Sequence, residues 1–209
     1  MANGIRSALQ ALARDGADAV ALASLALGLF ATRRFEEALD TARRAVASNP
    51  NYAIGHAVHG VLRAYFGDYE GCVEAIGRAQ RLSPRDPAAG VWLSQMAVGA
   101  FVVGRHAEGV EHAHRAVRAT PAFRGGYRAL AANLVALGRI DDARRVILDS
   151  DAVAPIGTLA QLRALAFPDG DAHERFCAAL GRAGVPEDDA TTVPATAARP
   201  RLVEPAYAA

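Results

Sequence analysis

The chain contains 209 residues, and its 23 arginines, lack of lysine and 22 acidic residues give a formal net charge of +1. This balance gives no argument for nucleic acid, a membrane surface or an acidic substrate as a ligand. The lack of lysine excludes Schiff-base chemistry and phosphate-loop lysines. The length fits one compact domain or one short solenoid.

The first residues show no basic region leading into an apolar run, and no stretch reaches about 18 uninterrupted apolar residues. We therefore expect neither a signal peptide nor a transmembrane helix, and we expect a cytoplasmic protein. The bias toward arginine and alanine is associated with bacterial genes of high GC content. Cys72 and Cys177 each lie in a helical pattern, and we expect both to be small buried apolar groups.

Four consecutive stretches share one pattern, in which a helix, a short turn and a second helix are followed by a proline. The prolines are Pro50, Pro84, Pro121 and Pro155, at spacings of 34, 37 and 34 residues. The clearest copy begins at Ala53 and has Gly67 and Asp68 at its turn. The pattern predicts helical repeats at 19–52, 53–86, 87–123 and 124–156, and residues 4–16 resemble the second half of a further repeat.

The three extra residues of the longer spacing lie near Asp86 and Pro87, just before a predicted helix at 88–103. Asp86 is a good N-cap and Pro87 suits the first helical position. We expect the extra residues to lengthen the loop or the start of this helix.

The period is lost after Pro155, where two further helices are predicted within 157–186. Thr158 can cap the first, and Asp171 with Glu174 resembles a capping box for the second. We expect this segment to cover the apolar end of the solenoid. Residues 187–209 are rich in alanine, threonine and proline without a period, and are expected to be disordered.

The 34-residue period and its punctuation resemble the tetratricopeptide repeat, a stacked helical hairpin. The resemblance implies an all-α fold, an α-α superhelix of about four hairpins extending over 1–186. Small residues are needed where the helices approach closely, and Gly60, Ala97 and Ala131 fill that role on first helices. Ala116 marks the contact of one repeat with the next.

In tetratricopeptide arrays the first helices of the repeats line a concave groove. Helical spacing assigns fifteen residues to this groove here: Val20, Ala23, Leu27, Phe30, Ile54, Ala57, Val61, Tyr65, Val91, Ser94, Val98, Phe101, Arg128, Ala132 and Val135. The set is mostly apolar with one cation, which predicts an apolar guest: a partner helix, a neighbouring domain, another copy or the chain's own tail. The alternative is that adjacent helices fill part of this face.

The sequence shows no catalytic or metal-binding pattern. His56 and His59 are three residues apart on a first helix, but no cysteine pair or His-Glu-x-x-His pattern accompanies them. His112 and His114 are expected to be solvated, and His106 to replace the aromatic residue that opens a second helix. Neither a nucleophile elbow nor a glycine-rich phosphate loop is present. We therefore predict a protein that is not an enzyme and uses no metal or cofactor.

The stretch LSPRDPAAGVWLSQMAVGAFVVG at 82–104, followed by RHAEGVEHAHRAVRATPAF and the closing FPDGDAHERFCAALGRAGVPE, supports a narrower resemblance. It is similar to the tetratricopeptide region that follows the catalytic domain of bacterial class III adenylate and guanylate cyclases, and that also occurs behind some DNA-binding regulators. The likeness covers roughly 19–186. None of a cyclase's metal-binding aspartates maps onto this chain, so cyclase activity is not implied.

Two functions follow as hypotheses. The first is a non-enzymatic scaffold that binds a protein partner or a neighbouring domain through the apolar groove, with a homo-oligomer as a further possibility. The second is a regulatory module of a nucleotide cyclase or transcription regulator, detached from its catalytic or DNA-binding domain or acting on it in trans.

Overall fold

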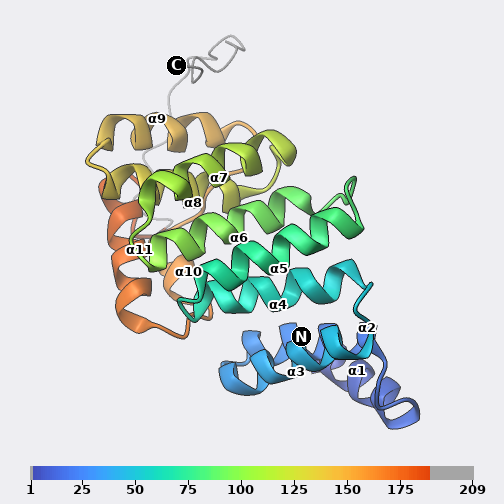
Figure 1. The fold of residues 1–209 in the computed structure, drawn as a ribbon. Helices are drawn as coiled ribbons and strands as arrows, with labels where there is room; N and C mark the ends of the chain where they lie inside the picture. Colours follow the sequence, from blue (N-terminus) through green and yellow to red (C-terminus); the bar gives the residue numbers. More distant parts are fainter. Residues whose placement is uncertain (1, 189–209) are drawn as a thin grey trace.

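The computed structural model describes residues 2–188 and contains only helices over that range (Figure 1). The helices are α1 (Ala2–Arg14), α2 (Ala19–Ala31), α3 (Phe35–Ser48), α4 (Ala53–Tyr65), α5 (Tyr69–Leu82), α6 (Ala89–Val102), α7 (His106–Ala119), α8 (Arg124–Ala136), α9 (Ile140–Asp151), α10 (Leu159–Arg163) and α11 (Gly170–Arg182). Helices α2 to α9 form four stacked hairpins, and α1 packs on α2 ahead of them. The fold is an α-α superhelix. Apart from residues 187 and 188, the predicted tail lies outside the described residues.

The turns inside the four repeat hairpins share one backbone geometry. In three repeats a glycine adopts positive φ: Gly67 at 75°, Gly104 at 80° and Gly138 at 79°. The next backbone N–H then donates to a carbonyl five residues back, as Asp68 does to Arg63 at 3.0 Å. This is the Schellman geometry, which favours glycine because a left-handed backbone clashes with a Cβ. Arg33 takes the same place in the first repeat with φ of 63°.

Close packing between the helices of a hairpin depends on small side chains. A Cβ added to Gly60 would lie 2.8 Å from the Ile76 side chain of the facing helix. Ala97, Ala131 and Ala143 are fully buried. Small residues at these positions therefore set the distance between helices.

The junction before α6 differs from the predicted cap. The Asp86 side chain accepts a hydrogen bond from the Ala88 N–H at 2.9 Å, and α6 begins only at Ala89. Asp86 therefore closes a turn and does not cap the helix, because its side chain bonds the N–H two residues ahead. The extra residues of this spacing lengthen the loop.

The two helices after the last repeat begin at different caps. Thr158 and Gln161 form a capping box at the start of α10. For α11 the predicted box of Asp171 and Glu174 is wrong, because Asp169 is the N-cap and accepts from the Ala172 N–H at 2.9 Å. The helix therefore starts at Gly170, one residue before Asp171.

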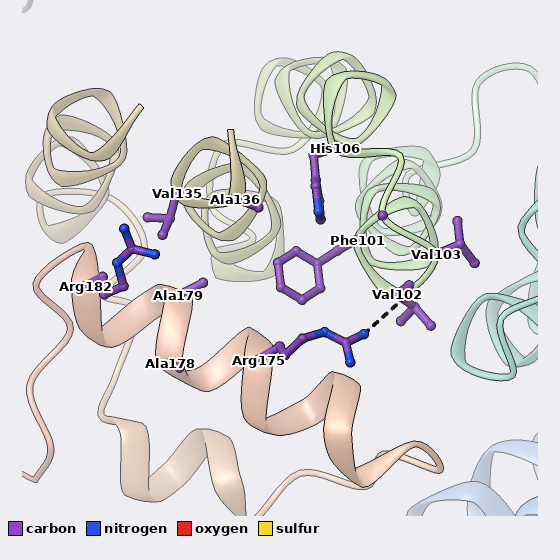
Figure 2. Close-up of a pocket in the computed structure, with 11 residues that line it drawn as sticks. Phe101, Val102, Val103, His106, Val135, Ala136, Arg175, Ala178, Ala179 and Arg182 are labelled. Atoms are coloured by element: carbon purple, nitrogen blue, oxygen red, sulfur yellow. Dashed lines mark hydrogen bonds between the residues drawn. The ribbon is translucent and has the colours of Figure 1, made fainter. Parts of the chain in front are cut away.

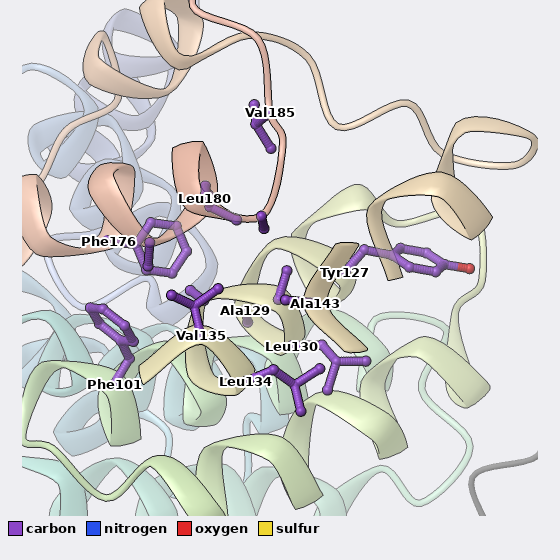
Figure 3. Packing of buried hydrophobic residues seen from close by; sticks show 14 of the residues in the cluster. Phe101, Tyr127, Ala129, Leu130, Leu134, Val135, Ala143, Phe176, Leu180 and Val185 are labelled. Carbon is purple, nitrogen blue, oxygen red and sulfur yellow. The ribbon is translucent and has the colours of Figure 1, made fainter. Parts of the chain in front are cut away.

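Helices α10 and α11 form a hairpin that we call the C-terminal hairpin (residues 156–185). Its helix α11 packs against α8 and crosses the direction of the repeat helices (Figure 1), while Ala183 and Val185 at its end line a pocket together with Ile147 and Leu148 of α9. Phe176 and Leu180 of α11 point toward Val135 of α8 in one buried cluster (Figure 3). The largest apolar cluster thus joins the last two repeats to this hairpin.

The end of the array carries both apolar and polar side chains: Leu148 of α9 is exposed and lines a pocket together with Ile147. On α9, Arg144 and Asp151 occupy the positions that Val110 and Val117 hold on α7, 34 residues earlier. Both polar side chains are exposed. Polar residues on the outer face are typical of a terminal repeat. The apolar stripe of α11 packs on the first helices of the last two repeats.

Replacing Ala116 with arginine tests the contact between repeats. Ala116 is 2% exposed, and a Cβ built on Gly126 of the next hairpin would lie 3.5 Å from its methyl group. We predict a loss of about 2–4 kcal/mol in the free energy of unfolding, because the larger side chain overpacks the site and buries an unpaired charge. Urea unfolding would measure it. Ala119→Arg on the exposed side of the same helix is the control and should change stability by less than about 0.5 kcal/mol. Equal stability of both variants would contradict this packing.

Candidate functional site

The fifteen predicted groove residues differ widely in exposure. Those that are exposed are Val20 at 56%, Leu27 at 46% and Ile54 at 44%. Those that are half-buried are Phe30, Val61, Tyr65, Val91 and Arg128. Those that are buried are Ala23, Ala57, Ser94, Val98, Phe101, Ala132 and Val135. The predicted set is therefore not one continuous open groove.

The C-terminal hairpin covers the ends of the first helices with two phenylalanines. The Phe167 ring packs edge-on against Tyr65 of α4 at 4.8 Å between centroids, and Phe176 packs edge-on against Phe101 of α6 at 5.2 Å. The ring centroid of Tyr65 also lies 5.0 Å from that of Phe30 on α2. Burial raises the pKa of Tyr65 to about 12. These aromatic contacts fill part of the face that was predicted to receive a partner.

Arginines fix the hairpin by donating to its backbone. The Arg128 Nε donates to the Ile156 carbonyl oxygen at 3.0 Å, and burial lowers the pKa of this guanidinium to about 10. Arg33 donates to the Leu165 carbonyl oxygen at 3.4 Å. The cation predicted to face a guest in the groove thus binds the chain's own C-terminal segment.

The remaining apolar part of the first-helix face lies on α2 and α4. We call it the open face and define it by Val20, Leu27, Ile54 and Val61. Val20 and Ile54 hold equivalent positions 34 residues apart, as do Leu27 and Val61. Since α2 and α4 pack against each other, the four side chains lie on neighbouring helices in the same register. The patch presents aliphatic side chains to solvent.

A separate pocket of about 530 Å³ lies between α11 and the ends of α6 and α8. Phe101, Val135 and Ala179 form its apolar floor. Arg175 projects from α11 beside the Phe101 ring toward Val102, and Arg182 projects from the other end of α11 near Val135 (Figure 2). We call it the α11 pocket. Residues from two repeats and the hairpin meet here, so the sequence pattern of a single repeat could not indicate it.

His106 lies beside the Phe101 ring in the same pocket. Its ring centroid is 5.3 Å from that of Phe101, and its Nδ1 is 3.2 Å from the Asn133 Oδ1. Asn133 is fully buried and donates to the Ala97 carbonyl oxygen at 3.1 Å. His106 therefore opens α7 with an aromatic ring, as Phe35 and Tyr69 open α3 and α5.

A polar cluster missed by the sequence analysis joins α5 to α7. The Tyr69 hydroxyl lies 3.2 Å from a Glu108 oxygen and 3.0 Å from the His112 Nε2. The Arg105 guanidinium lies over the Tyr69 ring at 4.8 Å. His112, expected to be solvated, is half-buried, and its Nδ1 has no hydrogen-bond partner among the described residues. The phenol at the start of α5 accounts for this burial, because its hydroxyl reaches across to α7.

Many solved structures resemble this chain, and three of them span most of its length. A tetratricopeptide-repeat protein from Thermus thermophilus, TTC0263, has a TM-score of 0.62 at 21% identity, covering 84% of this chain and 88% of that chain. PilW, a type IV pilus biogenesis factor, has a TM-score of 0.66 at 17% identity, covering 85% and 77%. A tetratricopeptide-repeat protein from Parabacteroides merdae has a TM-score of 0.61 at 15% identity, covering 86% and 69%.

The fold is that of a tetratricopeptide-repeat solenoid. No protein-family model matches the sequence, and no curated protein matches it. The narrower resemblance to the region behind cyclase domains stays a prediction. Within residues 2–188, no group of three or more potential metal ligands comes together, and no helix is long and apolar enough to cross a bilayer.

Three half-buried histidines predict a pH-dependent stability. Burial is the main cause that lowers the pKa of His59, His112 and His114. Each folded-state pKa then lies below the unfolded value near 6.5, so the unfolded chain binds protons more readily. Stability should be full above about pH 7 and should fall as the pH drops below about 6.5. Urea unfolding at several pH values measures this decrease in the free energy of unfolding. His112→Gln should show a smaller decrease with falling pH than the wild type, and an equal decrease would contradict the role of the burial of His112.

Proposed function

We propose that this chain is a non-enzymatic scaffold that binds a protein partner through the open face. The observation that carries the proposal is the exposure of Val20, Leu27 and Ile54 on two neighbouring first helices. The C-terminal hairpin fills the adjacent part of that face and leaves these side chains exposed. Contiguous exposed apolar residues of this kind mark interaction sites.

The spacing of the open face suits an apolar helix as the partner segment. Val20 and Leu27 are seven residues apart, two helical turns along α2, and Ile54 and Val61 repeat that spacing on α4. The apolar side of a partner helix can pack across two rows of aliphatic side chains spaced in this way. A segment of another protein or of a neighbouring domain meets this description equally.

The described cysteines support a role without covalent catalysis. Burial raises the pKa of the Cys72 thiol to about 12, and it also raises that of Cys177. Both side chains are fully buried. A buried thiol with a raised pKa is a poor nucleophile.

The second hypothesis, a regulatory module of a nucleotide cyclase or transcription regulator, remains a prediction from the sequence. Such a module would use the same open face toward its own catalytic or DNA-binding domain. A neighbouring reading frame that encodes either domain would favour this hypothesis.

A double substitution of the open face tests the scaffold. Leu27→Glu with Ile54→Glu should reduce capture of the partner by about tenfold or more, because each aliphatic side chain loses burial worth about 1.5–3 kcal/mol and carboxylates enter an apolar contact. Affinity capture from the source cells followed by quantitative mass spectrometry gives the measurement. Light scattering shows whether the captured protein is a second copy.

The matched control is Leu148→Glu on α9, where the wild-type side chain is 69% exposed and lies outside the open face. It introduces the same type of charge and should leave capture unchanged. If both variants capture the same proteins in the same amounts as the wild type, the open face is not the binding site.

A further inference from the structure

The α11 pocket combines an apolar floor with a basic rim. Phe101 and Val135 come from the first helices of the third and fourth repeats, and Ala178 and Ala179 come from α11. The charged side chains that line it are Arg175 and Arg182, and no aspartate or glutamate of residues 2–188 lines it. A volume of about 530 Å³ gives room for apolar side chains of a partner segment.

The two arginines of the rim make few hydrogen bonds or ion pairs within residues 2–188. Arg175 donates one hydrogen bond, to the Val102 carbonyl oxygen at 3.4 Å. Arg182 makes neither a hydrogen bond nor an ion pair with any residue of 2–188, although it suits the negative end of the α11 dipole. By contrast, Arg105, Arg139 and Arg163 each pair with a carboxylate. Since a guanidinium has five N–H donors, both rim residues can bind a further anion.

The spacing of the arginines defines the ligand that fits. Arg175 and Arg182 are seven residues apart on one side of α11, which is about 10.5 Å along the helix axis. A second helix laid beside α11 has the same rise, so carboxylates seven residues apart on it would come near the positions of both arginines. Its side chains three and four positions after the first carboxylate would then face Ala178, Ala179 and Phe101.

We propose that the α11 pocket binds an acidic amphipathic helix of a partner protein. Two carboxylates seven residues apart pair with Arg175 and Arg182, and the apolar side chains between them pack on the floor. Arginine suits this role because its planar fork can bind a carboxylate through two hydrogen bonds. The pocket lies on α6, α8 and α11, whereas the open face lies on α2 and α4, so this site does not depend on the proposed function.

A designed peptide tests the pocket directly. The probe is a fluorescein-labelled peptide of about 18 residues, rich in alanine and glutamine, with two glutamates seven positions apart and leucines three and four positions after the first. Fluorescence anisotropy with the full chain should show saturable binding that weakens as salt is added. The same peptide with glutamine in place of both glutamates should bind more weakly, by about fivefold or more.

Substitutions in the protein test the same ion pairs. Arg175→Gln with Arg182→Gln should weaken binding of the glutamate peptide about fivefold or more, while thermal melting stays near that of the wild type because both side chains are exposed. Arg115→Gln with Arg118→Gln removes the same charge from exposed positions of α7 outside the pocket and should leave binding unchanged.

Three results would overturn the proposal. The first is an absence of binding to the wild-type chain. The second is equal binding of the glutamate and glutamine peptides. The third is equal weakening by both double variants, which would show that net charge and not the pocket attracts the peptide. Loss of partner capture by the open-face variants would not alter any of these measurements, so the two proposals fail separately.

Discussion

The packing of Phe167 and Phe176 against Tyr65 and Phe101 determines which surfaces of this solenoid are available. Each hairpin must bury an apolar stripe, and stacking in the array buries most of it. The ends of the first helices in the later repeats remain apolar after stacking, and the C-terminal hairpin covers them. Aromatic pairs of this geometry add to the burial of their area, so the hairpin belongs to the same core as α6 and α8.

This arrangement divides the surface of the first helices into two parts. Toward the N-terminus, α2 and α4 keep aliphatic side chains exposed, and this part supports the proposed scaffold function. Toward the C-terminus, the edge of α11 adds two arginines to a floor built by the repeats. One part offers apolar contact and the other offers charge. A partner that presents both kinds of segment would bind more tightly than either segment alone, because the second contact becomes intramolecular.

The repeats could be predicted from the sequence because their signals are local and recur four times: a turn residue such as Gly67, small residues such as Gly60, and a proline stop. The place of α11 could not be predicted in the same way, because the stripe of Phe176 and Leu180 shows that one side is buried but does not identify the surface that buries it. Arg144 and Asp151 on α9 were a partial signal, since they add polar side chains to the end of the array beside Ile147 and Leu148. The α11 pocket depends on contacts between distant segments, which a repeat pattern does not encode.

Hydrogen exchange of the backbone amides tests most directly whether α11 is part of the core. If the C-terminal hairpin packs on the first helices as described, the amides in the middle of α11 should be protected nearly as strongly as those of α8, because both open only when the shared cluster opens. If the amides of α11 exchange orders of magnitude faster while α6 and α8 stay protected, the hairpin is a loosely attached segment. The division of the surface described above would then be wrong.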